Sequence, residues 1–217
     1  MSKPPLVRPI IILGGGGHAR VVIDALRCAG HVIAGVIDPK SDVAETLPED
    51  VTWLGKDLSA ARPGEVQVAI GVGSIDVGAR NPRPTLFAEA KAGGFEILSV
   101  RHPSAIVAGD VELGEGSQIM AGAILQPGVR LGVNCIVNTG ASLDHDCWIG
   151  DHVHIAPRAV LSGTVAVGDG SHLGTGAIVI QGIRIGSEAM IAAGAVVTRD
   201  VAATARVKPG NTETVQR

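Results

Sequence analysis

An aliphatic residue recurs at every sixth position through the second half of the chain. In steps of six from Val107 to Val197, all sixteen positions hold Val, Ile or Leu. The residue two places before each is mostly small, as at Ala105 and Ala195. Only 46% of all residues are apolar, so chance does not produce such a run. A short fixed period of this kind is typical of a solenoid built from repeated strands and turns.

A second period, of eighteen residues, lies on top of the first. Glycine follows the aliphatic residue in every third repeat, at Gly114, Gly132, Gly150, Gly168 and Gly186. Three six-residue units therefore form one coil of triangular cross-section, in which the aliphatic and the small residue both point inward. We expect these glycines to relax the backbone at a corner, where a positive φ is needed.

Composition excludes several classes of function. The chain of 217 residues has a net charge of −3, so it lacks the basic surface that nucleic-acid binding requires. No apolar run is long enough for membrane insertion. The three cysteines form no paired framework, which is typical of a reduced, cytoplasmic protein. Aromatic residues make up only 2%, in keeping with a narrow interior of Val, Ile, Leu and Ala.

The first half of the chain has the pattern of alternating strands and helices. We expect strands over residues 10–13, 31–37, 66–70 and 96–100, and helices over residues 19–29 and 85–92. The first strand is a continuous β-prone run, as in a strand buried on both faces of a parallel sheet. The order of elements predicts a small α/β domain of Rossmann-like type.

A glycine turn separates the first strand from the first helix. Gly14, Gly16 and Ala19 satisfy the pattern G-x-G-x-x-A, and Asp38 follows about 20 residues later. Backbone N–H groups at the start of a helix can hold a phosphate. Because the domain has only about 100 residues, roughly half of a two-lobed dinucleotide fold, we expect one nucleotide-diphosphate ligand instead of NAD. The alternatives are a turn that serves tight packing only, or an NAD-dependent oxidoreductase.

The segment SLDHDCWIGDHVHI, residues 142–155, is rich in histidine and aspartate. In the six-residue register His145 lies two residues past the inward Leu143, so we expect its side chain to emerge at a corner of the coil. His154 lies between two inward residues, Val153 and Ile155, so we expect it to face outward. The same register places Cys147 inside the coil. The pKa of histidine lies near neutrality, which suits a general base. Buried cysteine is a poor nucleophile, so we expect no covalent intermediate on Cys147.

The remaining histidines do not form a metal site in this interpretation. His152 and His154 alternate on one strand and could share a face, but no cysteine or carboxylate lies at ligand spacing. We therefore expect no metal. His152 and His172 are interpreted as surface or interface residues.

Three motifs occur in order along the chain: GGGGHA at residues 14–19, HPSA at residues 102–105 and DHDC at residues 144–147. Together with the six-residue repeat they resemble the NeuD/PglD/PerB family of bacterial sugar acyltransferases. The resemblance covers nearly the whole chain. It implies a Rossmann-like domain over residues 1–101, followed by a left-handed parallel β-helix of hexapeptide repeats over residues 102–217.

The resemblance also implies roles for individual residues of the β-helix. His145 matches the catalytic histidine of the family, a general base, and Asp146 matches the acidic residue that orients it. The positions that match acetyl-CoA contacts are His154, Gly163, Gly174 and Thr175. Active sites of such enzymes lie between the subunits of a homotrimer, so we expect a homotrimer here.

In the first domain the resemblance implies a nucleotide-sugar site. The matching positions are Gly14, Gly15, Gly16, Gly17, His18, Asp38, Pro39 and Gly71. The chain departs from the family at residues 73–84, which are longer and lack the usual polar pair; Arg80 or Arg83 could serve there. It also departs at the C-terminus, RVKPGNTETVQR, so cofactor contacts there are not carried over.

The activity implied by the resemblance is transfer of an acetyl group from acetyl-CoA to the amino group of a nucleotide-linked 4-amino-4,6-dideoxy sugar, for surface glycans. Two alternatives remain at this point. One is O-acetylation of a sialic acid or another sugar hydroxyl, which would use the same base. The other is a non-catalytic scaffold that binds a nucleotide sugar.

Overall fold

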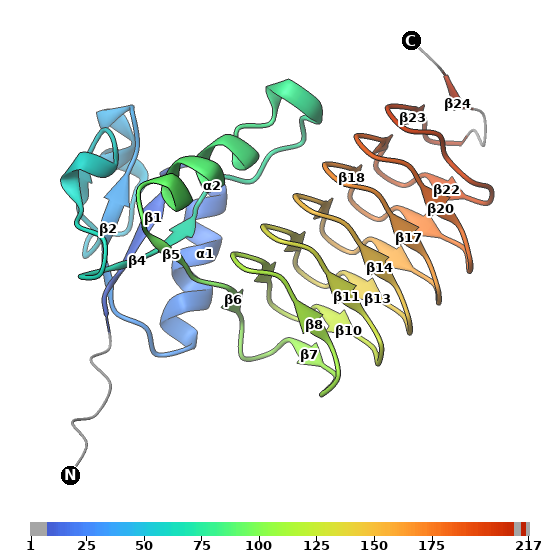
Figure 1. Ribbon diagram of the computed structural model, residues 1–217, viewed down its shortest axis with the longest axis horizontal. Helices are drawn as coiled ribbons and strands as arrows, with labels where there is room; N and C mark the ends of the chain where they lie inside the picture. The colour runs from blue at the N-terminus through green and yellow to red at the C-terminus, as the bar shows by residue number, and fades with distance from the viewer. Residues whose placement is uncertain (1–7, 211–213, 216–217) are drawn as a thin grey trace.

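The chain folds into an N-terminal α/β domain followed by a long parallel β-helix (Figure 1). The structure, a computed structural model, describes residues 8–210 and the strand pairing of residues 214–215. The outermost residues of both expected domains, and part of the atypical C-terminus, lie outside the described residues. None of the described helices is long and apolar enough to cross a membrane.

The N-terminal domain contains one parallel sheet of five strands in the order β3-β2-β1-β4-β5. The strands are β1 (Ile10–Leu13), β2 (Ile33–Ile37), β3 (Trp53–Gly55), β4 (Gln67–Ile70) and β5 (Glu96–Ile97). All neighbouring pairs are parallel. The sequence predicted four of these strands but not β3, whose three residues are too few to show a period.

Two helices cover opposite faces of this sheet, α1 (Gly17–Cys28) and α2 (Arg83–Ala92). Ile10 and Ile12 of β1 pack with α1, whereas Ile11 and Leu13 belong to the core on the side of α2. This alternation explains why the strand is apolar throughout. Short 3-10 helices connect the elements: η1 (Ser41–Thr46), η2 (Leu58–Ala60) and η3 (Gly78–Arg80).

The β-helix has three faces of two-residue strands, each pairing in parallel with the strand one coil away, except β24, which pairs antiparallel with β23. The face that we call the domain face contains β6 (Val100–Arg101), β9 (Gln118–Ile119), β12 (Ile136–Val137), β15 (His154–Ile155), β18 (His172–Leu173), β21 (Met190–Ile191), β23 (Arg206–Val207) and β24 (Thr214–Val215). The apolar face contains β7 (Ile106–Val107), β10 (Ile124–Leu125), β13 (Ser142–Leu143), β16 (Val160–Leu161), β19 (Ile178–Val179) and β22 (Val196–Val197). The third face contains β8 (Glu112–Leu113), β11 (Arg130–Leu131), β14 (Trp148–Ile149), β17 (Ala166–Val167) and β20 (Arg184–Ile185).

The interior of the β-helix confirms the register predicted from the six-residue period. The stepped aliphatic residues are buried at every position from Ile119 to Val197. The two exceptions, Val107 and Leu113, belong to the first coil, where no full coil lies beneath them. The coil begins earlier than the HPSA motif, because β6 already pairs with β9.

The role expected for the glycines spaced by eighteen residues is wrong. None of Gly114, Gly132, Gly150, Gly168 and Gly186 has a positive φ. The left-handed conformation falls two residues later in the turn, at positions such as Gly116, Asn134 and His152. The spaced glycines serve close approach instead, because a β-carbon at any of them would clash with the next coil. Absence of a side chain, and not a positive φ, is therefore the requirement at these corners.

Contacts between the two domains lie on the domain face. Val100 and Met120 join the core cluster on the α1 side of the sheet. The guanidinium of Arg83 donates to the backbone carbonyl of Val72 and, at 2.6 Å, to Oδ1 of Asn134 in the β-helix. Burial lowers the pKa of Arg83 to about 9, which still leaves it protonated at neutral pH. The junction is thus built from packed side chains and buried hydrogen bonds.

Gly168 provides a test of the close approach between coils. A β-carbon there would lie 2.5 Å from the backbone nitrogen of Ser187, so the coils would have to separate locally. We expect Gly168→Ala to lower the free energy of unfolding by about 1–3 kcal/mol, the usual cost of overpacking. Urea unfolding would measure it. Gly109→Ala is the control, because Gly109 lies in open space without a positive φ. Equal losses in both variants would contradict the interpretation.

Candidate functional site

His145 lies in the turn between β13 and β14, at the corner where the apolar face meets the third face. Its Nδ1 lies 2.9 Å from Oδ2 of Asp146. Asp146 has a φ of 58°, and this left-handed turn brings its carboxylate back toward the ring. Asp144 accepts a hydrogen bond from the backbone N–H of His145 at 2.7 Å, which is the turn chemistry often seen with aspartate.

The electrostatics of this corner favour a basic imidazole. The hydrogen bond with Asp146 raises the pKa of His145, and the negative charge of Asp144 adds to the rise. The side chain of His145 is about half exposed, at 51%. With Nδ1 donating to the carboxylate, the neutral ring keeps the lone pair of Nε2 free to accept a proton. The pair therefore has the geometry of a base with an orienting partner.

Gly163 lies one coil beyond His145 and leaves room for its ring. A β-carbon at Gly163 would lie 2.6 Å from Cε1 of His145 and closer still to Nε2. A side chain there would displace the imidazole. The structure therefore places Gly163 directly beside the predicted base.

His154 points out of the coil, as predicted, but it is not on the surface. The segment between β4 and α2 covers it, and Nδ1 donates to the carbonyl of Ser74 at 2.8 Å. Nε2 faces Nδ2 of Asn138 at 3.2 Å. Burial lowers the pKa of His154 to about 3. Both ring nitrogens are thus engaged within the chain, so a cofactor contact through this ring would require one of these bonds to open.

A small cavity lies at another corner of the coil, between the domain face and the apolar face. It has a volume of about 250 Å³, and Gly174 and Thr175 line it together with His172 and Ile75. His172 packs edge-on against His154, at 4.9 Å between ring centroids, and is buried within the chain instead of lying on its surface. Its buried Nδ1 has no hydrogen-bond partner among the described residues. The predicted cofactor residues therefore divide between two corners, with Gly163 at one and this cavity at the other.

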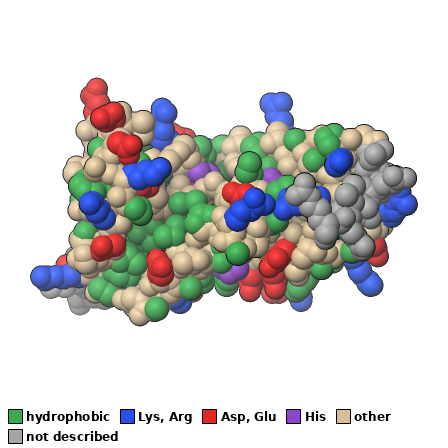
Figure 2. All heavy atoms as spheres, turned by 90° about the horizontal axis from the view of Figure 1, so that it is seen from above, with side chains coloured by type: hydrophobic (Ala, Val, Ile, Leu, Met, Phe, Trp, Pro, Cys, Tyr) green, Lys and Arg blue, Asp and Glu red, His purple; other side chains and the backbone are tan. Residues whose placement is uncertain are grey.

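The N-terminal domain contains a larger cavity of about 840 Å³ at the carboxyl ends of its strands. Three of the predicted substrate residues line it: Gly14, Asp38 and Pro39. Asp38 accepts a hydrogen bond from the backbone N–H of Gly15 at 2.7 Å and ties the glycine turn to the end of β2. Parallel α/β sheets commonly bind ligands at this edge. In Figure 2 this domain, on the left, shows hydrophobic side chains with charged side chains around them.

Several residues of this cavity were not found from the sequence. They are Lys56, Asp57, Ser59, Asn81, Thr85 and Glu89. Lys56 follows β3, so recognising that strand would have pointed to it. Of the two arginines considered, Arg80 lines the cavity, whereas Arg83 is fully buried.

Other predicted substrate residues support the cavity without lining it. Nε2 of His18 lies 2.7 Å from Oε1 of Gln118 in the β-helix, and burial lowers the pKa of His18 to about 4. Gly71 packs so closely that a β-carbon would clash with the carbonyl of Gly14. Gly16 and Gly17, by contrast, face open space at the start of α1.

The N-terminal part of the chain matches a known family model. Residues 9–80 match the model described as the PglD N-terminal domain. The UDP-N-acetylbacillosamine N-acetyltransferase of Bacillus subtilis (strain 168) is 38% identical over 118 residues. That match covers 53% of this chain and 52% of the relative, so the chain spans about half the length of the curated relative it matches.

Several solved structures match nearly the whole chain. One is a histidine-to-asparagine variant of perosamine N-acetyltransferase from Caulobacter crescentus in complex with CoA and GDP-perosamine; it is 33% identical with a TM-score of 0.85, over 97% of this chain and 98% of that one. Another is the acetyltransferase domain of PglB from Neisseria gonorrhoeae FA1090 in complex with acetyl coenzyme A, with 30% identity, a TM-score of 0.86 and coverage of 96% and 99%. These similarities confirm the predicted fold class, a Rossmann-like domain followed by a left-handed β-helix.

An NMR titration of the His145 ring tests the electrostatics of the corner. Asp146→Asn removes the carboxylate that raises the pKa of His145, so we expect a lower pKa in this variant. Asp144→Asn removes a weaker influence and should lower the pKa less. Asp42→Asn, in the other domain, is the control and should leave it unchanged. A pKa that does not fall in Asp146→Asn would contradict the proposed pairing.

Proposed function

The chain belongs to the NeuD/PglD/PerB family of sugar acetyltransferases, and from that premise we propose that it acetylates the amino group of a nucleotide-linked 4-amino-4,6-dideoxy sugar. The acetyl donor is acetyl-CoA. The observation that carries the mechanism is the His145–Asp146 pair at a corner of the coil. The cytoplasmic location expected from the sequence stays a prediction, which cell fractionation would test.

In this mechanism His145 acts as a general base. Nε2 takes a proton from the amino group as its nitrogen forms a bond to the acetyl carbon. The carboxylate of Asp146 stabilises the imidazolium that results, and the proton is then available to the departing thiolate. Cysteine takes no part, because burial raises the pKa of Cys135 to about 12 and that of Cys147 to about 11.

The cavity of the N-terminal domain fits the nucleotide part of the substrate. Gly16 and Gly17 are exposed at the start of the twelve-residue helix α1, and the free N–H groups of a helix N-terminus suit a diphosphate. Lys56 and Arg80 line the cavity and supply positive charge. We assign the predicted substrate residues to this site, with His18 and Gly71 as supports.

The cavity beside Gly174 and Thr175 is our candidate for the CoA part of the donor. The unpartnered Nδ1 of His172, a residue that lines it, would gain a hydrogen-bond partner from a polar ligand. His154 lies behind this site, where its ring packs edge-on against the ring of His172. Gly163 lies beside the ring of His145, so in this proposal it is next to the acetyl group that is transferred.

We propose that these parts meet between subunits of a homotrimer. The corner that holds His145 is opposite the domain face, so His145 turns away from the nucleotide cavity of its own chain. The apolar face carries a row of exposed aliphatic side chains in register. The row includes Ile106, Val160, Ile178 and Val196. Exposed apolar surface of this kind marks an interface.

Turnover with a panel of acceptors tests the activity. Acetyl-CoA is incubated with UDP-, dTDP- and GDP-linked 4-amino sugars, and with a hydroxylated sugar such as sialic acid. We expect acetylation of a 4-amino sugar, and a fall in turnover of about 10²–10⁴-fold in His145→Asn. His31→Asn, a half-buried histidine outside the site, is the control.

The outcomes of this assay separate the alternatives. Acetylation of the hydroxylated sugar alone would replace N-acetylation by O-acetylation. Full turnover in His145→Asn would remove the proposed base. A preparation that binds a nucleotide sugar but acetylates no acceptor would indicate a scaffold.

Sedimentation velocity tests the assembly. Ile178→Asp places a charge in the row on the apolar face, so we expect the trimer to dissociate and turnover to fall with it. Val32→Asp is the matched control, because Val32 is an exposed aliphatic residue of the N-terminal domain. A monomeric wild-type chain with full activity would contradict the shared site.

A further inference from the structure

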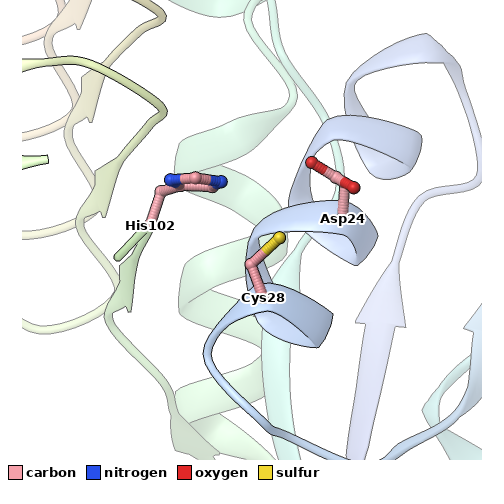
Figure 3. A group of neighbouring side chains, drawn as sticks. All are labelled: Asp24, Cys28 and His102. Carbon is pink, nitrogen blue, oxygen red and sulfur yellow. The ribbon is translucent and has the colours of Figure 1, made fainter. Parts of the chain in front are cut away.

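Three side chains able to ligate a metal meet where α1 approaches the first coil. Asp24 and Cys28 are four residues apart on α1 and so project from one side of the helix. His102 follows β6 at the junction between the domains. One ligand atom from each residue lies within 4.8 Å of the others. Figure 3 shows the carboxylate, the thiol and a ring nitrogen around one space between α1 and the β-helix.

Two of these three side chains make no hydrogen bond or ion pair in the part of the chain that the structure describes. Neither the carboxylate of Asp24 nor the thiol of Cys28 has a hydrogen bond or ion pair to residues 8–210. The backbone N–H of Ser104 donates to Nδ1 of His102 at 3.0 Å, and Oγ of Ser104 lies 2.7 Å from the same nitrogen. Nε2 is the nitrogen without a partner among the described residues, and to bind a metal it has to give up the proton that it carries while Nδ1 accepts.

Disulfide formation within the chain does not explain the exposed thiol. Cys28 is exposed, whereas Cys135 and Cys147 are buried in the coil. The thiol instead has an imidazole and a carboxylate as neighbours, which is a mixed set of sulfur, nitrogen and oxygen donors. Zinc accepts all three donor types.

We propose that Asp24, Cys28 and His102 bind a zinc ion that joins α1 to the first coil of the β-helix. Tetrahedral zinc holds its ligand atoms about 3.5 Å apart, given bonds of about 2.0–2.3 Å. The ligand atoms of the three side chains lie within 4.8 Å of one another, so rotation of the side chains has to bring them closer. Water completes the fourth position, which the exposure of Asp24 and Cys28 leaves open. The thiol gives up its proton on binding, and the sulfur binds as thiolate.

The position of Ser104 suits an outer partner of such a site. Its Oγ contacts Nδ1 of His102 and also accepts a hydrogen bond from the backbone N–H of Gly122, one coil away, at 3.1 Å. When zinc binds Nε2, the ring proton moves to Nδ1, which then donates to Oγ of Ser104 in place of accepting from its backbone N–H; an outer partner of this kind orients a histidine ligand. The ion would hold the N-terminal domain against the coil, in a role separate from that of His145.

Alkylation of Cys28 tests the site on the full chain. Iodoacetamide modifies the exposed thiol, and the raised pKa values of the two buried cysteines keep them unreactive. We expect one equivalent of zinc chloride to slow the alkylation of Cys28, followed by peptide mass spectrometry, at least about ten-fold. Asp24→Asn and His102→Ala should each weaken this protection about ten-fold or more, since even outer partners affect metal affinity to that degree. Asp42→Asn is the control carboxylate and should keep full protection.

Cobalt(II) provides a second measurement on the same protein. Its binding should produce a thiolate charge-transfer absorption in the wild type and none in Cys28→Ser. Unchanged alkylation in the presence of zinc would overturn the proposal. Protection that persists equally in Asp24→Asn and His102→Ala would also overturn it, because the ion would then bind the thiol alone.

Discussion

The close stacking of successive coils is the constraint on which the rest of the β-helix depends. A residue and the one eighteen positions later lie directly above one another. The glycines spaced by eighteen residues, at the corner between the third face and the domain face, let the backbones of successive coils approach closely. The same stacking produces cross-coil hydrogen bonds, such as Asp151 Oδ1 accepting from Val133 N–H at 2.8 Å. Each side chain outside the core is therefore placed by two coordinates, its corner and its coil. His145 beside Gly163 is one result of that rule.

Hydrogen bonds between buried polar groups hold the N-terminal domain against the β-helix. The domain face and the turns beside it carry several polar side chains, and the N-terminal domain covers them. Gln118 forms a hydrogen bond with His18, and Asn134 accepts one from Arg83. His154 donates a hydrogen bond to the carbonyl of Ser74. Burial keeps both His18 and His154 neutral, since it lowers their pKa values to about 4 and about 3. Each polar group at the junction thus has a partner, with the exception of His172 Nδ1 among the described residues.

Prediction from the sequence succeeded where a short period repeats over a long stretch of the chain. It failed where contacts depend on tertiary structure. The six-residue repeat gave the inward register because every coil repeats the same burial. It could not show why Gly168 is glycine, since the neighbouring Ser187 is defined only by the stacking distance. Nor could it show that residues 73–84 cover His154. His102 and Cys28 are 74 positions apart, so their proximity comes only from the packing of α1 on the first coil.

His145 and the nucleotide cavity of the same chain lie apart because the β-helix has a triangular cross-section. One side of the triangle is covered by the N-terminal domain, and the corner opposite that side carries His145. A straight coil offers no bend that could bring this corner to the nucleotide cavity of the same chain. A second chain placed along the apolar face can bring its own cavity there, and the exposed row from Ile106 to Val196 provides the surface for it. The shape of one subunit is therefore the physical reason for proposing that the reaction requires several.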